Sequence, residues 1–302
     1  MWWQRSCAPP TGSEAAERAA RLAHPGPGED GKVILCAVLI MDKATDEALS
    51  PLVEAEEDGL LRKAIRHFRT ASRLRRCALF HSLFHVAEES RILDLGGANG
   101  AYVAALLTGT AAQPANVYIA DIDHEAVHSA ATRFGYTPVF LEESGDLPFP
   151  DHYFDVVLCS SVLEHVTIPK RDVWRERSGS TFSGLARAHQ RQFAKELSRV
   201  AVGYFVQVPS RWFPIETHTW LPFVGYLPRS LQCRVIEISN RVWIKETIPD
   251  FYLPTASDLL EYFPTAELRR ERVFGVTKSL IAVKRPSSYG LAPRTVSPTG
   301  DR

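Results

Sequence analysis

The chain lacks any excess of charge of one sign, because 35 lysine and arginine residues balance 35 aspartate and glutamate residues among 302. A balanced chain has no general attraction for the phosphate backbone of nucleic acid, so nucleic acid is not expected as a partner. Long apolar runs are also missing, since none approaches the roughly 20 residues needed to cross a bilayer. We therefore expect no integral membrane association.

Cysteine is scarce, and the five cysteines include no C-x-x-C pair. This spacing supports neither a disulfide framework nor a structural zinc site, and it fits reduced thiols in a cytoplasmic protein. Internal repeats are absent as well. The remaining expectation is a globular chain, since 45% hydrophobic content over this length can build a substantial core.

The composition divides the chain into three parts. Residues 1–55 mix proline, glycine, alanine and charges without sustained periodicity, so we expect much of this part to be poorly ordered. The sequence leaves open whether the first forty residues belong to the functional protein. Residues 56–285 are expected to form the domain, and residues 286–302 a disordered tail. Apolar residues at helical spacing in 54–88 predict one or two amphipathic helices. Their arginine-rich stretch 62–76 is more readily a solvated face than a patch for an acidic substrate or a membrane surface.

From residue 91 on, short apolar runs alternate with helical patterns. The predicted strands are 91–95, 116–120, 137–141, 154–159, 203–208 and 279–284. Helices are predicted over 102–107, over 125–133 and up to residue 200. Such alternation requires right-handed crossovers, and it predicts an α/β fold with a doubly wound, mostly parallel sheet. Residues 209–264, rich in proline and aromatics, interrupt the alternation and are expected to form an inserted lid.

A glycine-rich loop, Asp94-Leu-Gly-Gly-Ala-Asn-Gly100, follows the first predicted strand. Glycines let the backbone turn tightly and approach a ligand closely, which indicates a nucleotide-like ligand. The dinucleotide pattern G-x-G-x-x-G is degraded, because Ala98 and Ala101 stand where glycine is needed after Gly96. A carboxylate at Asp94 also disfavours a diphosphate, by on the order of 1 kcal/mol at about 4 Å in water, whereas it favours an ammonium or a sulfonium.

Two further acids follow the next strands. Asp121 lies 25 residues beyond Gly96, where a carboxylate can accept both hydroxyls of a ribose, although NAD would fit this feature equally well and the side chain could simply cap a helix. Glu143 can accept the amino group of adenine, and the backbone N–H of Ser144 can bind a ring nitrogen. Glu142 and Asp146 are near enough to replace Glu143.

These motifs resemble class I S-adenosylmethionine-dependent methyltransferases. ILDLGGANG (residues 92–100) looks like their first motif, with alanine and asparagine replacing the commoner glycine and threonine, and residues 146–166 are similar to the segment around their fourth strand. The resemblance implies a seven-stranded, Rossmann-like methyltransferase fold and S-adenosyl-L-methionine as the cofactor. It implies a cofactor pocket lined by Asp94, Gly96, Gly97, Ala98, Gly100, Asp121, Ile122, Glu143, Ser144 and Ser160. More loosely, residues 195–200, 208–228 and 274–285 look like a bacterial subgroup associated with sugar or cell-surface glycan modification.

Three side chains are candidates for catalysis. His165 follows the fourth strand, where the resemblance places the reactive end of the methyl donor, so it is either a general base or a hydrogen-bonded structural histidine. Glu216 and His218 lie beyond the fifth strand among aromatics, and they suit either an acceptor pocket or a polar turn packed under Trp212 and Trp220. A dedicated base is not required, because alignment of an activated sulfonium with its acceptor carries much of methyl transfer.

Two histidine pairs have the i, i+4 spacing that could clamp a metal from one helical face: His81 with His85, and His124 with His128. Neither pair has a third ligand nearby in the sequence, so we expect surface histidines and no metal.

The function that follows is transfer of a methyl group to an oxygen or nitrogen of a small-molecule or glycan-linked acceptor, with hydroxyl acceptors first. The alternatives are a non-catalytic module that binds the adenosyl group, and an NAD-dependent or nucleotide-sugar-dependent enzyme. The oligomeric state is left open by the sequence.

Overall fold

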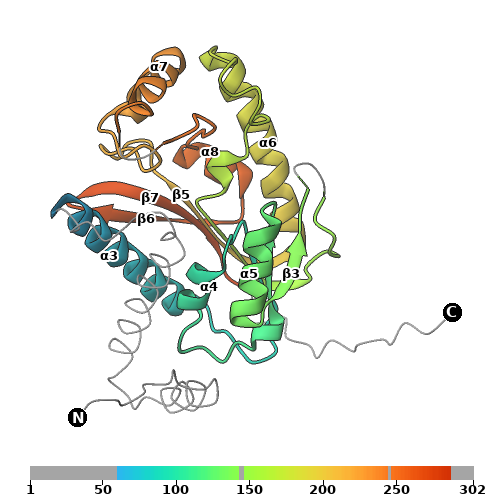
Figure 1. Cartoon of the computed structure of the whole chain (residues 1–302). Helices are drawn as coiled ribbons and strands as arrows, with labels where there is room; N and C mark the ends of the chain where they lie inside the picture. Colours follow the sequence, from blue (N-terminus) through green and yellow to red (C-terminus); the bar gives the residue numbers. More distant parts are fainter. Residues whose placement is uncertain (1–59, 143–145, 244–245, 287–302) are drawn as a thin grey trace, which may run out of the picture. The chain divides into compact units, whose positions relative to one another are not determined.

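The structure is a computed structural model that describes residues 60–142, 146–243 and 246–286 (Figure 1). The chain forms two compact units. As far as it is described, the smaller unit consists of the chain up to His81 together with Ala104–Ala111. The larger unit comprises Ser82–Val103 and the chain from Ala112 onward, and it holds the sheet.

The first described helix, α3 (Leu60–Leu83), is a single helix where the sequence predicted one or two. Because α3 ends at Leu83, His85 lies outside it, and the predicted i, i+4 pair with His81 does not share a helical face. His81 instead pairs through Nε2 with the carbonyl oxygen of Leu106, at 2.8 Å. Leu106 ends the short helix α4 (Ala101–Leu106). No helix in the described part of the chain has the length and apolar character needed to span a membrane.

A seven-stranded sheet forms the centre of the larger unit. Its strands are β1 (Ile92–Leu95), β2 (Val117–Asp121), β3 (Thr137–Phe140), β4 (Phe154–Ser160), β5 (Ala201–Pro209), β6 (Glu267–Val273) and β7 (Val276–Lys284). Their order is β3-β2-β1-β4-β5-β7-β6. Neighbours among the first five strands run parallel, while β7 pairs antiparallel with both β5 and β6. This arrangement confirms the predicted doubly wound fold and adds β6, which the sequence had not marked as a strand.

Helices α5 (His124–Phe134) and α6 (Gly179–Val200) connect β2 to β3 and β4 to β5. Because these two connections step across the sheet in opposite directions, right-handed crossovers place the helices on opposite faces. Asp123 caps the start of α5 by accepting from the N–H of Ala126, and Ser178 caps α6 in the same way through Thr181.

The segment between β5 and β6 is more structured than its proline and aromatic content suggested. It contains a 3-10 turn at Val224–Tyr226 and two helices, α7 (Arg229–Ser239) and α8 (Ala256–Tyr262). Further 3-10 turns lie at Pro114–Asn116 and Leu163–His165.

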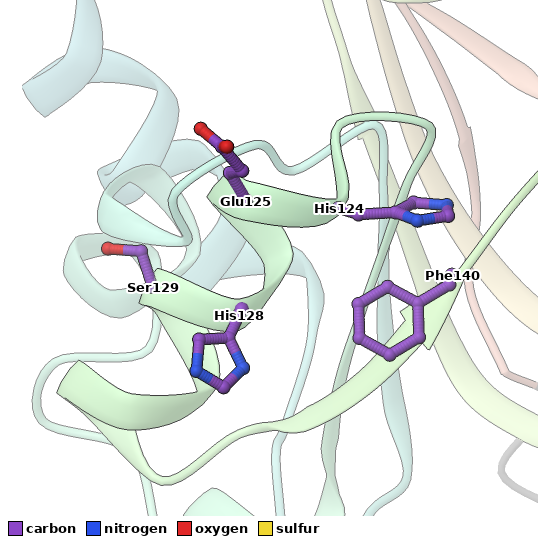
Figure 2. Close-up of a pocket in the computed structure, with 5 residues that line it drawn as sticks. All are labelled: His124, Glu125, His128, Ser129 and Phe140. Carbon is purple, nitrogen blue, oxygen red and sulfur yellow. The ribbon is translucent and has the colours of Figure 1, made fainter.

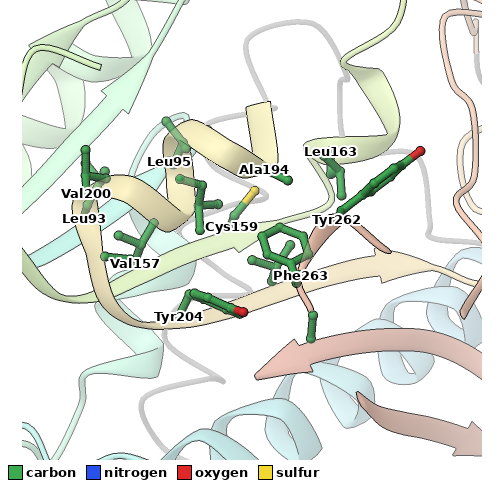
Figure 3. Close-up of a cluster of buried hydrophobic side chains, with 14 of the residues drawn as sticks. Leu93, Leu95, Val157, Cys159, Leu163, Ala194, Val200, Tyr204, Tyr262 and Phe263 are labelled. Carbon is green, nitrogen blue, oxygen red and sulfur yellow. The ribbon is translucent and has the colours of Figure 1, made fainter. Parts of the chain in front are cut away.

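The main hydrophobic core packs between the sheet and the helices α6 and α8 (Figure 3). It includes Leu93 and Leu95 of β1, Val157 of β4, and Phe263 directly after α8. All four β1 residues are buried, as expected for a central parallel strand covered on both faces. The rigid centre therefore fixes the carboxyl ends of β1, β2, β4 and β5, where the loops bearing the candidate residues begin.

Candidate active site

The glycine loop after β1 requires glycine at two positions for steric reasons. A Cβ on Gly96 would lie 2.3 Å from Cγ2 of Val162, and a Cβ on Gly97 would lie 2.2 Å from Oδ2 of Asp94. Gly96 and Gly100 also have positive φ angles of 77° and 70°, which side chains other than glycine rarely adopt. The loop is therefore pressed against both the Asp94 carboxylate and the segment that follows β4.

The same loop holds Asp121 in place. Ala98, which has a φ of 45°, donates its backbone N–H to Oδ2 of Asp121 at 2.9 Å. The N–H of Asp123 donates to Oδ1 at 3.0 Å. The alternative role of Asp121 as the cap of α5 is wrong, because Asp123 is that cap. Asp121 is thus fixed at the end of β2, beside the loop that follows β1.

Asp94 is the unusual acid of this site. Its side chain is buried, with 2% exposure, and Oδ2 accepts no hydrogen bond. Burial, with a smaller contribution from the charge of Asp121, raises the pKa of Asp94 to about 7. A buried carboxylate beside a second acid has the chemistry to receive a cation and opposes a diphosphate. The ammonium and sulfonium of S-adenosylmethionine fit this requirement.

The other predicted cofactor residues differ in what the structure shows. Ile122 is an exposed apolar side chain directly after Asp121. Ser160, at the end of β4, donates its hydroxyl to Oε1 of Gln207 on β5 at 2.8 Å. Glu143 and Ser144 lie outside the described residues.

The three predicted catalytic residues come together in one cluster. His165 ends the 3-10 turn after β4, and its Nδ1–H donates to Oδ1 of Asp250 at 3.0 Å. The Nδ1–H of His218 donates to Oε1 of Glu216 at 2.6 Å. The two imidazole rings meet edge to face, with centroids 4.7 Å apart. His218 also stacks on the ring of Phe251.

Glu216 serves both as a turn residue and as the partner of His218. Its carboxylate accepts the backbone N–H groups of His218 and Thr219 at 2.7 to 3.0 Å, which fits the predicted polar turn. Burial favours the neutral acid, but the hydrogen bonds and charge of His218 outweigh it and lower the pKa of Glu216. Burial likewise opposes the charge of His218, but Glu164 and Glu216 together raise its pKa to about 9. The free protein therefore holds His218 as an imidazolium at neutral pH, which excludes it as a general base in that state.

Two members of the cluster were missed by the sequence analysis, Glu164 and Asp250. Glu164 is fully buried, and its Oε1 lies 3.6 Å from Nε2 of His218. A charged residue inside the apolar turn Val162-Leu-Glu-His165 was a usable signal. Asp250 lies 85 residues from its partner His165, and nothing in the local pattern marks it.

The cluster and the glycine loop share one edge of the sheet. They follow β4 and β1, which are neighbours, and Val162 touches the loop two residues before Glu164. Burial raises the pKa of the Cys159 thiol, and the charges of both Glu164 and Asp94 add to this effect. Asp94 on β1 and Glu164 in the turn after β4 therefore both raise the pKa of the same thiol.

The remaining histidine pair lies on the surface, as predicted. His124 and His128 on α5 line a shallow depression of about 540 Å³ together with Phe140, Glu125 and Ser129 (Figure 2). The ring of His124 packs on Phe140 with centroids 5.0 Å apart.

Comparison with known proteins gives one family match. The methyltransferase domain family matches residues 93–178, which run from β1 to the start of α6. This range includes Asp94, Asp121 and His165. No curated protein matches the chain.

Solved structures of low identity are also similar to the chain. An S-adenosylmethionine-dependent methyltransferase from Aquifex aeolicus is 16% identical over 70% of this chain and 88% of its own, with a TM-score of 0.39. Magnesium protoporphyrin IX methyltransferase from Synechocystis, solved with bound S-adenosylmethionine, is 14% identical over 86% of this chain and 100% of its own, with a TM-score of 0.42. A possible exported protein from Bordetella parapertussis is 10% identical over 90% and 95%, with a TM-score of 0.48.

The family match, the strand order and the acids at the ends of β1 and β2 agree with one another. Residues 93–178 of the chain therefore match a methyltransferase domain in sequence, and the sheet around them has the strand order predicted for that fold.

Proposed function

We propose that this S-adenosylmethionine-dependent methyltransferase methylates a hydroxyl oxygen, or less readily an amine nitrogen, of a small-molecule or glycan-linked acceptor. The observation that carries the proposal is the cluster of His165, His218 and Glu216 at the carboxyl edge of the sheet, beside the glycine loop. A hydroxyl must lose its proton as its oxygen is methylated, and a polar cluster at this edge supplies groups that accept a proton or stabilise the resulting oxyanion.

The donor side of the proposal rests on Asp94 and Asp121. Asp94 would pair with the ammonium group, because a buried carboxylate with an unpartnered oxygen gains most from a cation. Asp121, fixed by two backbone N–H groups, would accept the ribose hydroxyls. Ile122 would cover the adenine, and Glu143 and Ser144 remain proposed adenine contacts. The bound cofactor supplies a methyl group already activated by its sulfonium.

The acceptor side rests on His165. Asp250 accepts a hydrogen bond from the Nδ1–H of His165, which fixes the ring orientation and leaves Nε2 for another partner. The side chain of His165 is 37% exposed, whereas those of His218 and Glu216 are 14% and 1% exposed. His165 is therefore the member of the cluster that an acceptor reaches first. His218 and Glu216 form a buried, charged pair next to it.

The segment between β5 and β6 shapes the acceptor side. It supplies Glu216, His218 and Asp250, so the predicted lid at 209–264 contributes three of the five residues of the cluster rather than only a cover. We assign the functional domain to residues 56–285. The free thiols of Cys77, Cys159 and Cys233 and the balanced charge favour a cytoplasmic enzyme that does not act on nucleic acid.

Two measurements test this function. Calorimetric titration of the purified chain with S-adenosylmethionine and, separately, with NAD should give micromolar binding of the methyl donor alone. Binding of NAD without the donor would show a different enzyme class. An assay for S-adenosylhomocysteine across sugars, lipids and small phenols should then find turnover with hydroxyl acceptors, and donor binding without turnover on any of them would indicate a non-catalytic module.

The role of His165 is tested separately. His165→Gln should lower kcat by about a hundredfold while leaving the affinity for the donor within about twofold. His128→Gln on the surface of α5 is the matched control and should leave both unchanged. Equal turnover in the His165 variant and the wild type would remove this side chain from the mechanism.

A further inference from the structure

The carboxylate of Glu164 has no role in the function proposed above. Its side chain is fully buried, and neither Oε1 nor Oε2 accepts a hydrogen bond. A buried carboxylate without hydrogen bonds is costly, and buried charges in proteins are normally paired or coordinate metals. Nε2 of His218 lies 3.6 Å from Oε1 of Glu164, which is an ion-pair distance.

In both histidines of the cluster, a carboxylate binds the same ring atom, Nδ1. Asp250 holds Nδ1 of His165, and Glu216 holds Nδ1 of His218. A carboxylate on one ring nitrogen fixes the tautomer and leaves the other nitrogen to bind a metal, which is the arrangement behind most metal-bound histidines. Ligand atoms of Glu164, His165 and His218 all lie within 4.8 Å of one another.

We propose that Glu164, His165 and His218 bind one divalent transition-metal ion, with Zn²⁺ preferred, and that Asp250 and Glu216 orient the two imidazoles. Two imidazoles and one carboxylate form the ligand set of zinc sites that keep a fourth position open. The sequence predicted no metal because it offered only the two helical histidine pairs. The site found here combines residues 164 and 165 with residue 218, which lies in the segment after β5.

The acceptor hydroxyl would bind the ion at its open coordination position. This part of the inference rests on the proposed methyl transfer. The partly exposed side of His165 leaves room for an outside ligand at the ion. A hydroxyl oxygen that binds there would have its pKa lowered by the ion, as a zinc-bound water does, and would release its proton to solvent. The resulting alkoxide or phenolate would form the new O–CH₃ bond as the S–CH₃ bond of the donor breaks and S-adenosylhomocysteine leaves. With the ion bound, His165 holds the ion and does not act as a free base. Alcohols and phenols are therefore the expected acceptors.

Direct metal binding tests the proposal without donor or acceptor. Tag-free full-length protein, stripped with EDTA, is titrated with Co²⁺ and followed by its visible absorption, and Zn²⁺ is then added in competition. The expected result is one Co²⁺ per chain, displaced by Zn²⁺. Glu164→Gln and His218→Gln should each weaken Co²⁺ binding at least tenfold, and Asp250→Asn about tenfold. His128→Gln changes one histidine of the surface pair on α5 and should bind Co²⁺ as the wild type does.

Two results would overturn the proposal: no stoichiometric Co²⁺ or Zn²⁺ binding by the wild type, or unchanged affinity in Glu164→Gln. If Glu164→Gln does not fold, His165→Gln takes its place, because that side chain is partly exposed, and its unchanged affinity would count equally against the site. Failure here is distinguishable from failure of the proposed function. Donor binding and turnover that persist without metal would leave the methyltransferase assignment intact and return His165 to the role of base.

Discussion

Replacement of Asp94 by asparagine should stabilise the ligand-free protein at alkaline pH, although Asp94 belongs to the proposed donor site. Burial and the charge of Asp121 raise the pKa of Asp94 from 3.8 to about 7 in the folded chain. Between these two values the folded state binds more protons than the unfolded state, so stability falls as the pH rises through this window. Below about pH 4 the cost vanishes, and above about pH 7 it is complete.

The magnitude follows from the size of the pKa change. A difference of about 3 units corresponds to about 4 kcal/mol at pH 8, at 1.36 kcal/mol for each unit. Because the asparagine amide is also buried, we expect Asp94→Asn to raise the free energy of unfolding by about 2 to 4 kcal/mol at pH 8. The gain should shrink by about 1 kcal/mol at pH 6, where most Asp94 carboxyls of the wild type are protonated.

Urea unfolding at pH 6 and pH 8 without ligand measures this difference directly. Asp123→Asn is the matched control, because asparagine also caps a helix and the side chain of Asp123 is exposed, so its stability should stay within about 0.5 kcal/mol of the wild type. Destabilisation by Asp94→Asn at pH 8 would refute the reasoning, since it would mean that the carboxylate is satisfied in the free protein.

Donor affinity should rise with pH, whereas the stability of the ligand-free protein falls. The wild type should bind S-adenosylmethionine about tenfold more weakly at pH 6 than at pH 8, because only about a tenth of its Asp94 is ionised at the lower pH. Asp94→Asn should bind more weakly at pH 8 and show little dependence on pH. Calorimetry at the two pH values checks both statements, and a wild-type affinity that does not change with pH would contradict the role of Asp94.

Three other substitutions have defined outcomes. Gly97→Ala would place a Cβ 2.2 Å from Oδ2 of Asp94, so donor binding should be lost in calorimetry while the circular dichroism spectrum stays unchanged. Asp121→Ala should weaken donor binding at least tenfold and free the N–H of Ala98, with turnover at saturating donor much less affected. Arg199→Ala should lower the free energy of unfolding by about 2 kcal/mol in urea, because its guanidinium holds two backbone carbonyls of the segment before β4. A loss below about 0.5 kcal/mol would show that solvent replaces those contacts.

The sequence predicted the strands at the centre of the sheet and the edge strand β3, and it missed β6 at the other edge. β1, β4 and β5 are almost fully buried, so each appears as a continuous apolar run. β6 reads Glu-Leu-Arg-Arg-Glu-Arg-Val, and four of its seven residues are exposed. A strand with one neighbour needs little apolar surface, and charged side chains protect its free edge from other chains. Its only sequence signal is the apolar β7 that follows.

The site was predictable where a few consecutive residues create it. Asp94 and the glycines form one turn, and Asp121 ends one strand, so both could be placed from local pattern. His165 and His218 could each be suspected, but their contact depends on how the segment after β5 folds back over β4. Asp250 completes the cluster from 85 residues away, and only the tertiary structure brings it there.

The loops at the carboxyl edge of the sheet hold conformations that oppose stability. Ala98, Ser161, Trp220 and Phe223 all have φ between 45° and 62°, the region that glycine prefers, and they lie in loops that follow β1, β4 and β5. Strain of this kind costs on the order of 1 kcal/mol at each residue and persists only where the surrounding structure enforces it. The carboxylate of Asp94, whose Oδ2 accepts no hydrogen bond, adds electrostatic cost at the same edge. The buried sheet stabilises the fold enough to offset these costs. A ligand that relieves the electrostatic cost therefore binds more tightly, because its binding removes an unfavourable term of the free protein.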